Sequence, residues 1–466
     1  MEPVSAPGRR DPSDAAARRR PSPLARLDRI PVWPYEKRLL WVIGAGYFFA
    51  FFDIVTISFA LPVIATQFHA SKGAVSLSVT SSLIGYIIGA IGDSQVADKW
   101  GRRLSLAVSV ALFSVGTALA ALSWNVESLV VFRFISGLGI GAEIAAVTTY
   151  LSEISPAPLR GRYTSWATTA AYAGFAVVPF VARLLVPTFA AGWRILFAIG
   201  ALGGVTILFM RRGIPASPRW LVSQGRSQEA AEVVADAEQT AQDNLDENEE
   251  LPPPQPVPDE ASAERFPIRA LLQPPMARRL VLFIGIWFVY YIGNYGWLTL
   301  GPTLFTDKGY SLADSTSYLI VSGIGFLAGA FATTRFSDRL ERKYTAAAFA
   351  TLWAIALLVI GLFVSPAIII VFGFIASASV GLLVPLLYTY TAEHFATNAR
   401  ATGVAMTDGL GHIGGALAPL IVLGANAAWG FSGAFIVMAA TGVLTAGLVL
   451  LGIQATGRSL EMTAAT

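Results

Sequence analysis

Two ionisable residues lie inside long apolar segments of the sequence, away from the charged ends of those segments. Asp53 is flanked by Phe52 and Ile54, and Arg133 lies early in another apolar segment. A carboxylate in an apolar medium costs several kcal/mol unless it is protonated or paired with a cation. If the cation can turn away, the carboxylate can take up and release a proton. We therefore expect Asp53 and Arg133 to form a proton-binding pair. The alternative is a permanent ion pair that holds two helices together.

A second carboxylate, Glu143, follows Arg133 by ten residues, which is about three turns or ~15 Å along a helix. It comes just after Gly137, Gly139 and Gly141, whose spacing allows a neighbouring helix to pack closely. We expect Glu143 to be a second proton-binding site or a cation contact for a solute. The alternative is a carboxylate that is hydrogen-bonded to a neighbouring helix.

Aromatic side chains with hydroxyl and amide neighbours predict a cavity for a small polar organic solute. The expected cavity residues are Tyr291, Asn294, Tyr295, Trp297, Tyr388, Asp408 and His412. Asp408 and His412 are four residues apart, so they share a helix face and could relay protons. Alternatively, Asp408 lies near a helix end as a gate contact, and the Tyr and Trp residues mark a membrane interface.

The composition defines the elements that must position these residues. The hydrophobic fraction is 54% and the charged fraction 14%, compared with roughly 25% charged residues in soluble domains. We therefore expect a polytopic membrane protein. The sequence has no Cys, which excludes disulfides and thiol catalysis, and its three His residues are too scattered to predict a metal site. No nucleophile–base pattern or cofactor-binding loop is evident, so we expect no enzyme, no cofactor and no nucleic-acid partner.

Twelve apolar runs of about the length that crosses a bilayer predict an all-α membrane protein with two six-helix bundles. They cover about 39–64, 75–97, 104–122, 128–151, 163–187, 193–211, 280–305, 313–334, 344–364, 366–390, 401–425 and 431–453. The expected organisation is a disordered N-terminal tail (1–38), a first bundle (39–211), a central cytoplasmic loop (212–278), a second bundle (279–453) and a C-terminal tail (454–466). The central loop contains a predicted amphipathic helix over about 227–242.

The distribution of basic residues predicts the orientation of the chain. If the N-terminus lies inside, the inner segments hold 28 Lys and Arg residues and the outer segments hold 4. Such a bias places both termini in the cytoplasm. We expect a multi-pass, monomeric protein of the inner (plasma) membrane, with the lipid bilayer, a small organic solute and protons as partners.

Charged motifs recur in the two halves with a spacing of 240 residues. Asp98, Arg102 and Arg103 reappear as Asp338, Arg342 and Lys343, and Glu153 and Arg160 reappear as Glu393 and Arg400. In the first copy Gly101 allows a tight reversal between two helices, whereas Glu341 takes its place in the second. The common spacing predicts two similar bundles with a pathway between them.

These motifs resemble those of the major facilitator superfamily. The segment Asp98–Arg103 is similar to the D-[RK]-x-G-R-[RK] loop of that family, although Ser94 replaces a usual glycine, and Glu153–Gly161 matches its E-x-x-P-x-x-x-R-G pattern. Ser217–Leu221 resembles the SPRWL element of sugar porters. The resemblance implies a cytoplasmic gate formed by Asp98, Arg102, Arg103, Glu153, Arg160, Asp338, Arg342, Glu393 and Arg400.

The resemblance also implies a function. In sugar porters, the positions that match Asp53 and Arg133 couple a proton to the substrate. The chain is therefore expected to be a secondary active transporter, a proton symporter of a sugar, sugar acid or other organic acid, working by alternating access. One alternative is a drug or metabolite:proton antiporter, although helix five lacks the Gly-Pro segment typical of drug antiporters. The other is a transporter-like nutrient sensor without net transport.

Overall fold

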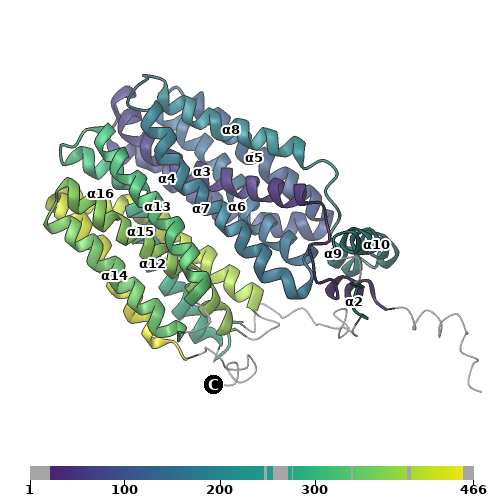
Figure 1. Ribbon diagram of the computed structural model, residues 1–466. Helices are drawn as coiled ribbons and strands as arrows, with labels where there is room; N and C mark the ends of the chain where they lie inside the picture. Colours follow the sequence, from purple (N-terminus) through teal and green to yellow (C-terminus); the bar gives the residue numbers. More distant parts are fainter. Residues whose placement is uncertain are drawn as a thin grey trace, which may run out of the picture. The chain divides into compact units, whose positions relative to one another are not determined.

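The computed structural model describes residues 21–245, 249–254, 271–274, 276–336, 340–395 and 400–454, and all regular elements in these ranges are helical. The helices (Figure 1) are α2 (Pro23–Asp28), α3 (Lys37–Gln67), α4 (Lys72–Trp100), α5 (Arg102–Ala121), α6 (Val126–Ile154), η1 (Ala157–Leu159), α7 (Arg160–Leu185), α8 (Gly192–Met210), α9 (Pro218–Ser223), α10 (Ser227–Asp243), α12 (Met276–Asp307), α13 (Leu312–Phe336), α14 (Arg342–Leu362), α15 (Pro366–Glu393) and α16 (Arg400–Leu451).

Within the described ranges, 11 helices are long and apolar enough to cross a membrane. The last of them, α16, has 52 residues and is interrupted at Gly430, where φ is 70° and ψ is −172°. A positive φ of this size favours glycine, so Gly430 marks the boundary between two membrane-length segments. Each of the twelve predicted spans therefore corresponds to a helical segment, and the predicted fold class is confirmed.

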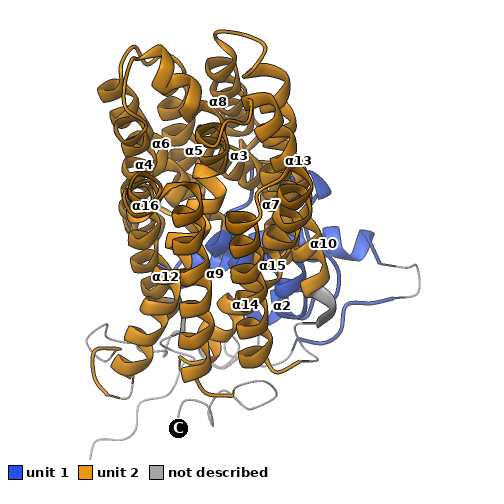
Figure 2. Ribbon diagram, turned by 90° about the vertical axis from the view of Figure 1, so that its left-hand side faces the viewer, with its two compact units in different colours: residues 1–40, 148–164, 214–264 blue, residues 41–147, 165–213, 265–466 orange. Residues whose placement is uncertain are grey.

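The chain forms two compact units, which are coloured separately in Figure 2. Unit 1 contains residues 1–40, 148–164 and 214–264, and unit 2 contains residues 41–147, 165–213 and 265–466. Unit 2 carries most of the length of the apolar helices. It also contains Asp53, Arg133, Glu143 and all of the expected cavity residues.

Glycines in unit 2 bring pairs of helices into backbone contact, and these contacts recur with the predicted spacing of 240 residues. A Cβ atom at each of these glycines would collide with the facing backbone, which is why the residue must be glycine. The matching contacts are Gly85–Phe134 and Gly325–Phe374, Gly89–Leu138 and Gly329–Ala378, and Gly141–Tyr86 and Gly381–Phe326. The repeat first seen in the charged loops therefore extends to the packing of α4 on α6 and of α13 on α15.

The two halves of unit 2 also contact one another, and α4 packs against α16. Thr80 donates a hydrogen bond to the carbonyl of Ala416 at 2.7 Å. Lys72, at the start of α4, forms an ion pair with Asp307 at the end of α12. Asn426 of α16 donates to the same carboxylate at 3.0 Å. These polar contacts hold helices from both halves together at one end of unit 2.

Unit 1 corrects one expectation about the N-terminal tail. The sequence predicted a disordered segment over 1–38, but α2 forms within it. Arg26 and Arg29 both donate to Glu238 of α10, at 2.5 and 2.8 Å. Asp28 accepts from Arg219 at 2.7 Å. The prediction missed this order because the partners lie about 200 residues away in the sequence. The predicted amphipathic helix is present as α10.

Candidate functional site

Asp53 on α3 and Arg133 on α6 form an ion pair inside unit 2. Nη1 of Arg133 lies 2.6 Å from Oδ2 of Asp53, and both side chains are at most 1% exposed. Thr117 of α5 donates to Oδ1 of Asp53 at 2.9 Å, and Arg133 also contacts Ser82 of α4 at 3.3 Å. The guanidinium lies 5.5 Å from the ring centre of Phe197 on α8. The structure thus brings together the two residues that the sequence paired.

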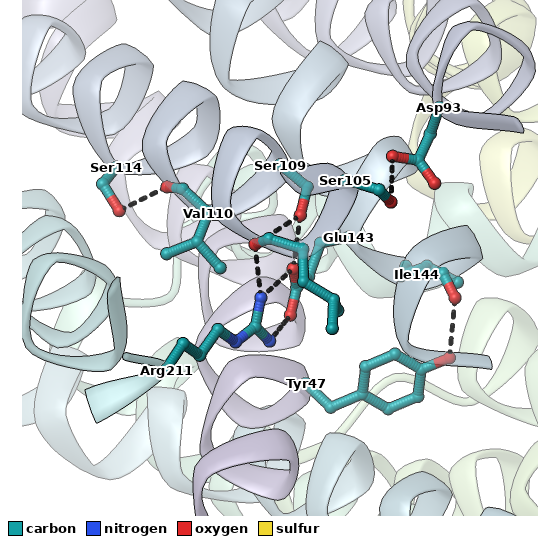
Figure 3. Close-up of polar contacts among 10 residues, drawn as sticks. Tyr47, Asp93, Ser105, Ser109, Val110, Ser114, Glu143, Ile144 and Arg211 are labelled. Carbon is teal, nitrogen blue, oxygen red and sulfur yellow. Dashed lines mark hydrogen bonds and ion pairs between the residues drawn. The ribbon is translucent and has the colours of Figure 1, made fainter. Parts of the chain in front are cut away.

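A second buried ion pair lies in the same group of helices. Glu143 of α6 accepts hydrogen bonds from Arg211 at 2.9 Å and from Ser109 of α5 at 2.7 Å. Nη1 of Arg211 also donates to the carbonyl of Leu106 at 2.6 Å. Figure 3 shows the guanidinium of Arg211 facing the Glu143 carboxylate. Gly46 of α3 lies so close that a Cβ atom there would collide with both charged groups.

The sequence did not identify Arg211 as the partner of Glu143. Arg211 is the last residue of the sixth predicted apolar run, 193–211, and it is 5% exposed in the structure. The reason is its position: it follows directly after α8 and precedes Arg212, so its sequence neighbours resemble a charged helix end. A buried carboxylate without an assigned cation was the signal that a partner was missing.

Asp408 and His412 of α16 lie in a cluster of aromatic side chains. Oδ1 of Asp408 accepts hydrogen bonds from the hydroxyls of Tyr291 at 2.6 Å and Tyr388 at 2.7 Å. The His412 ring lies between two tyrosine rings, with centroid distances of 3.9 Å to Tyr291 and 4.4 Å to Tyr86. Tyr86 comes from α4, so the cluster joins the two halves of unit 2.

A small cavity lies between the buried ion pair and this aromatic cluster. Its lining residues are Ile54, Ile57, Val79, Ser82, Leu83, Tyr86, Arg133, Gly137, Ile140, Tyr295 and Thr299. The walls therefore combine one arginine, two tyrosines, the hydroxyl-bearing residues Ser82 and Thr299, and mainly aliphatic residues. Tyr86 and Tyr295 line the cavity and also pack around His412, with ring distances of 4.4 and 6.0 Å. Sequence reasoning found Tyr295 but missed Tyr86, which stands among apolar and small residues of α4 without any motif.

Other expected cavity residues lie behind this lining. Trp297 is 1% exposed and donates its indole N–H to Ser377 at 3.0 Å, so it packs within the second half of unit 2. Asn294 is 8% exposed, and its Oδ1 is buried without a hydrogen-bond partner among the described residues. Of the seven expected cavity residues, Tyr295 alone is among the residues that line this cavity. In the described part of the chain, no cluster of three or more His, Asp or Glu residues could hold a metal ion.

The structure describes most, but not all, of the expected gate residues. Asp98 and Arg102 form an ion pair of 2.8 Å across the turn at Gly101, where φ is 93°. In the second copy, Arg342 pairs with Glu393 at 2.5 Å. Arg103 is exposed. Glu153 and Arg160 belong to unit 1. Asp338 lies outside the described residues, as does the side chain of Arg400.

A comparison with protein families identifies the chain. The sequence profile described as the Major Facilitator Superfamily matches residues 43–419, with a second match over 318–461. The chain belongs to the major facilitator superfamily. It shares the fold of the xylose transporter XylE from E. coli in its inward open conformation, with a TM-score of 0.72 and 21% identity over 92% of this chain and 99% of that one.

Two relatives within the superfamily carry specific names. The niacin transporter NiaP of Acinetobacter baylyi is 29% identical over 440 residues, which cover 94% of this chain and 98% of NiaP. The 4-hydroxybenzoate transporter PcaK of the same organism is 27% identical over 414 residues, covering 85% of this chain and 87% of PcaK. The chain is therefore a multi-pass membrane transporter of small organic solutes, and it is not an enzyme.

Proposed function

We propose that this transporter carries a small aromatic carboxylate together with a proton. The observation that carries the proposal is the double role of Arg133. Arg133 lines the cavity, and its guanidinium forms the ion pair with Asp53. The side chain that pairs with the carboxylate of Asp53 thus also borders the space in which a solute would bind.

This sharing couples the proton to the anion. A buried guanidinium that loses its partner costs about 3–5 kcal/mol, so Arg133 needs one carboxylate at all times. When Asp53 is ionised, its own carboxylate is the partner of Arg133. When Asp53 takes up a proton, Arg133 is free to pair with the carboxylate of the solute. Proton and anion therefore enter together and leave together, which is symport.

The rest of the lining supports an aromatic solute. Tyr86 and Tyr295 offer ring faces, and Ile54, Ile57 and Val79 supply apolar area. A planar ring can stack on such tyrosines at a favourable distance. The names of NiaP and PcaK, which refer to niacin and 4-hydroxybenzoate, agree with this chemistry. A sugar has no carboxylate for Arg133, so the sugar substrate expected from the sequence is the weaker candidate.

The remaining expectations complete the proposal. The two halves rock about the cavity, and the charged loops that contain Asp98, Arg102 and Glu393 close the cytoplasmic side. Both termini lie in the cytoplasm, and the protein works as a monomer in the inner membrane. Glu143 is the second candidate for proton transfer, after Asp53.

The test is uptake of labelled benzoate, nicotinate and 4-hydroxybenzoate into proteoliposomes, with xylose as the control solute. An inward proton gradient should drive accumulation of at least one acid above its external concentration, and dissipating the gradient should abolish it. The same acid should raise the melting temperature of the purified protein, because it binds the native state. Accumulation driven by an outward proton gradient would instead support antiport, and stabilisation without any uptake would support a sensor.

A further inference from the structure

Two histidines of unit 2 share one local arrangement but differ at one nitrogen. In His394, Nδ1 lies 2.7 Å from the carbonyl of Tyr390, four residues earlier. In His412, Nδ1 lies 2.9 Å from the carbonyl of Asp408, also four residues earlier. A carbonyl can only accept, so in the neutral imidazole Nδ1 carries the hydrogen and Nε2 is left as an acceptor.

The Nε2 atoms of the two histidines differ in their hydrogen bonds. At His394, Nε2 accepts the backbone N–H of Ile453 at 3.2 Å, which agrees with the tautomer deduced from Nδ1. At His412, no hydrogen bond to Nε2 is formed by any described residue. His412 is nevertheless 4% exposed and lies between Tyr86 and Tyr291. Nε2 of His412 is not among the fully buried side-chain atoms that lack a hydrogen-bond partner, so this acceptor keeps some exposure and is open to a donor from a small molecule.

The surroundings of His412 do not supply the missing donor. The hydroxyl groups of Tyr291 and Tyr388 both donate their hydrogen bonds to Oδ1 of Asp408. Asp408 is itself an acceptor when ionised. On the other side, Tyr86 and Tyr295 connect His412 to the cavity, because both rings line it and both pack near the imidazole. His412 itself is not among the lining residues, so a solute in the cavity would reach Nε2 at the edge of the cavity, beside these two tyrosines.

The geometry points to His412 as a specificity-determining residue that accepts a hydrogen bond from a ring substituent of the solute. The substrate class is then an aromatic carboxylate that carries a hydroxyl or another N–H or O–H donor on the ring. This inference rests on the proposed function, in which Arg133 binds the carboxylate of the same solute. An acceptor on the ring, such as an ether oxygen or an unprotonated pyridine nitrogen, would face the lone pair of Nε2 and be disfavoured.

The test compares three probes that share the benzoate core: 4-hydroxybenzoate, 4-methoxybenzoate and benzoate. Their dissociation constants are measured on the purified full-length transporter at neutral pH. A net hydrogen bond of roughly 0.5–1.5 kcal/mol predicts that the hydroxy acid binds about 2- to 12-fold more tightly than the methoxy acid. In His412→Phe, which keeps a ring between the tyrosines, this ratio should fall to about one. In His412→Gln, whose side-chain carbonyl offers an acceptor, part of the ratio should return.

His394→Phe is the matched control, since it removes the histidine whose Nε2 is already satisfied, and it should keep the wild-type ratio. The inference is overturned if wild type binds the hydroxy and methoxy acids equally, or if His412→Phe weakens both by the same factor. It is also overturned if His394→Phe abolishes the ratio as His412→Phe does. If none of the three acids binds to wild type, the proposed function fails and this inference fails with it. Melting temperatures identify any variant that has lost its fold.

Discussion

Glu143 and Arg211 form a buried ion pair that packs against the backbone of a neighbouring helix, at a glycine. The helix is α3, and the residue is Gly46, where a Cβ atom would collide with both the carboxylate and the guanidinium. The pair lies close to the helices that hold Asp53 and Arg133: α3, α5 and α6 contribute to both pairs, and Arg211 directly follows α8, whose Phe197 contacts Arg133. Two buried ion pairs thus hold the helices of the first half of the transporter together.

The contact at Gly46 gives the first prediction. Gly46→Ala should destabilise the protein by about 1–3 kcal/mol, because the added methyl group must displace an ion pair in a packed interior. The measurement is the melting temperature in detergent. Gly447→Ala on α16 is the control, since its Cβ position has no atom within 4 Å. Equal melting temperatures for Gly46→Ala and wild type would contradict the close contact.

The second prediction concerns the pair itself. Glu143→Gln and Arg211→Gln should each destabilise the protein by about 3–5 kcal/mol, because each leaves one buried charge without a partner. The double variant should be more stable than the sum of the two losses predicts. The same double variant tests proton transfer through Glu143. If it still accumulates solute in response to a proton gradient, Glu143 is not needed for coupling.

The third prediction concerns Asp53. Asp53→Asn mimics the protonated carboxyl, so it should abolish gradient-driven accumulation while leaving solute binding measurable. Uptake into proteoliposomes with and without an inward proton gradient gives the result. Asp93→Asn is the matched control, because Asp93 is another buried carboxylate but is hydrogen-bonded to Ser105 rather than to a cavity residue. Accumulation by Asp53→Asn at the wild-type level would make the pair structural.

The fourth prediction concerns the contact between the two halves at Lys72 and Asp307. Their side chains are 39% and 24% exposed, so the pair contributes only about 0.2–1 kcal/mol. Asp307→Asn should therefore raise the population open at this end by up to about fivefold. Because the chain has no Cys, a single Leu83→Cys in the cavity reports opening through its rate of labelling by a maleimide.

Two variants sharpen this test. Lys308→Gln removes a neighbouring cation without touching the pair, and it should leave the labelling rate unchanged. Exchange of the two charges, Lys72→Asp with Asp307→Lys, should restore the wild-type rate. A faster rate in the exchanged variant, equal to that of Asp307→Asn, would show that the ion pair does not control opening.

The fifth prediction is a pH dependence of stability that arises from His394, just beyond the end of α15. The pKa of His394 is lowered from 6.5 to about 4, chiefly by burial; the hydrogen bond to the carbonyl of Tyr390 opposes this shift, and nearby Arg279 and Lys343 contribute to it. The unfolded chain therefore binds a proton between these values while the folded chain does not. Stability from this group is complete above pH 6.5 and is lost as the pH falls towards 4.

The expected loss between pH 7 and pH 5 is about 2 kcal/mol, since one pKa unit corresponds to about 1.4 kcal/mol. Melting temperatures across this range should fall less steeply for His394→Phe than for wild type. Parallel curves for the two proteins would contradict the role of His394.

The sequence by itself determined the membrane class, the number of helical segments and the repeat. These follow from hydropathy and from charged motifs, which act along the chain, because every ~20-residue apolar run must form a helix to satisfy its backbone in the bilayer. Asp53 and Arg133 could be paired in the same way. An isolated carboxylate inside one apolar run requires a cation, and Arg133 is the isolated cation of another.

Tertiary structure decided the rest, because rotation and packing of helices determine which side chains meet. Arg211 stands beside Arg212 at a helix end, and only the packing of α8 turns it inward to Glu143. Tyr86 has no motif, yet α4 places its ring between the cavity and His412. Trp297 looked like a cavity residue but faces Ser377 within its own half. These outcomes depend on contacts between residues far apart in the sequence, which periodicity and composition do not encode.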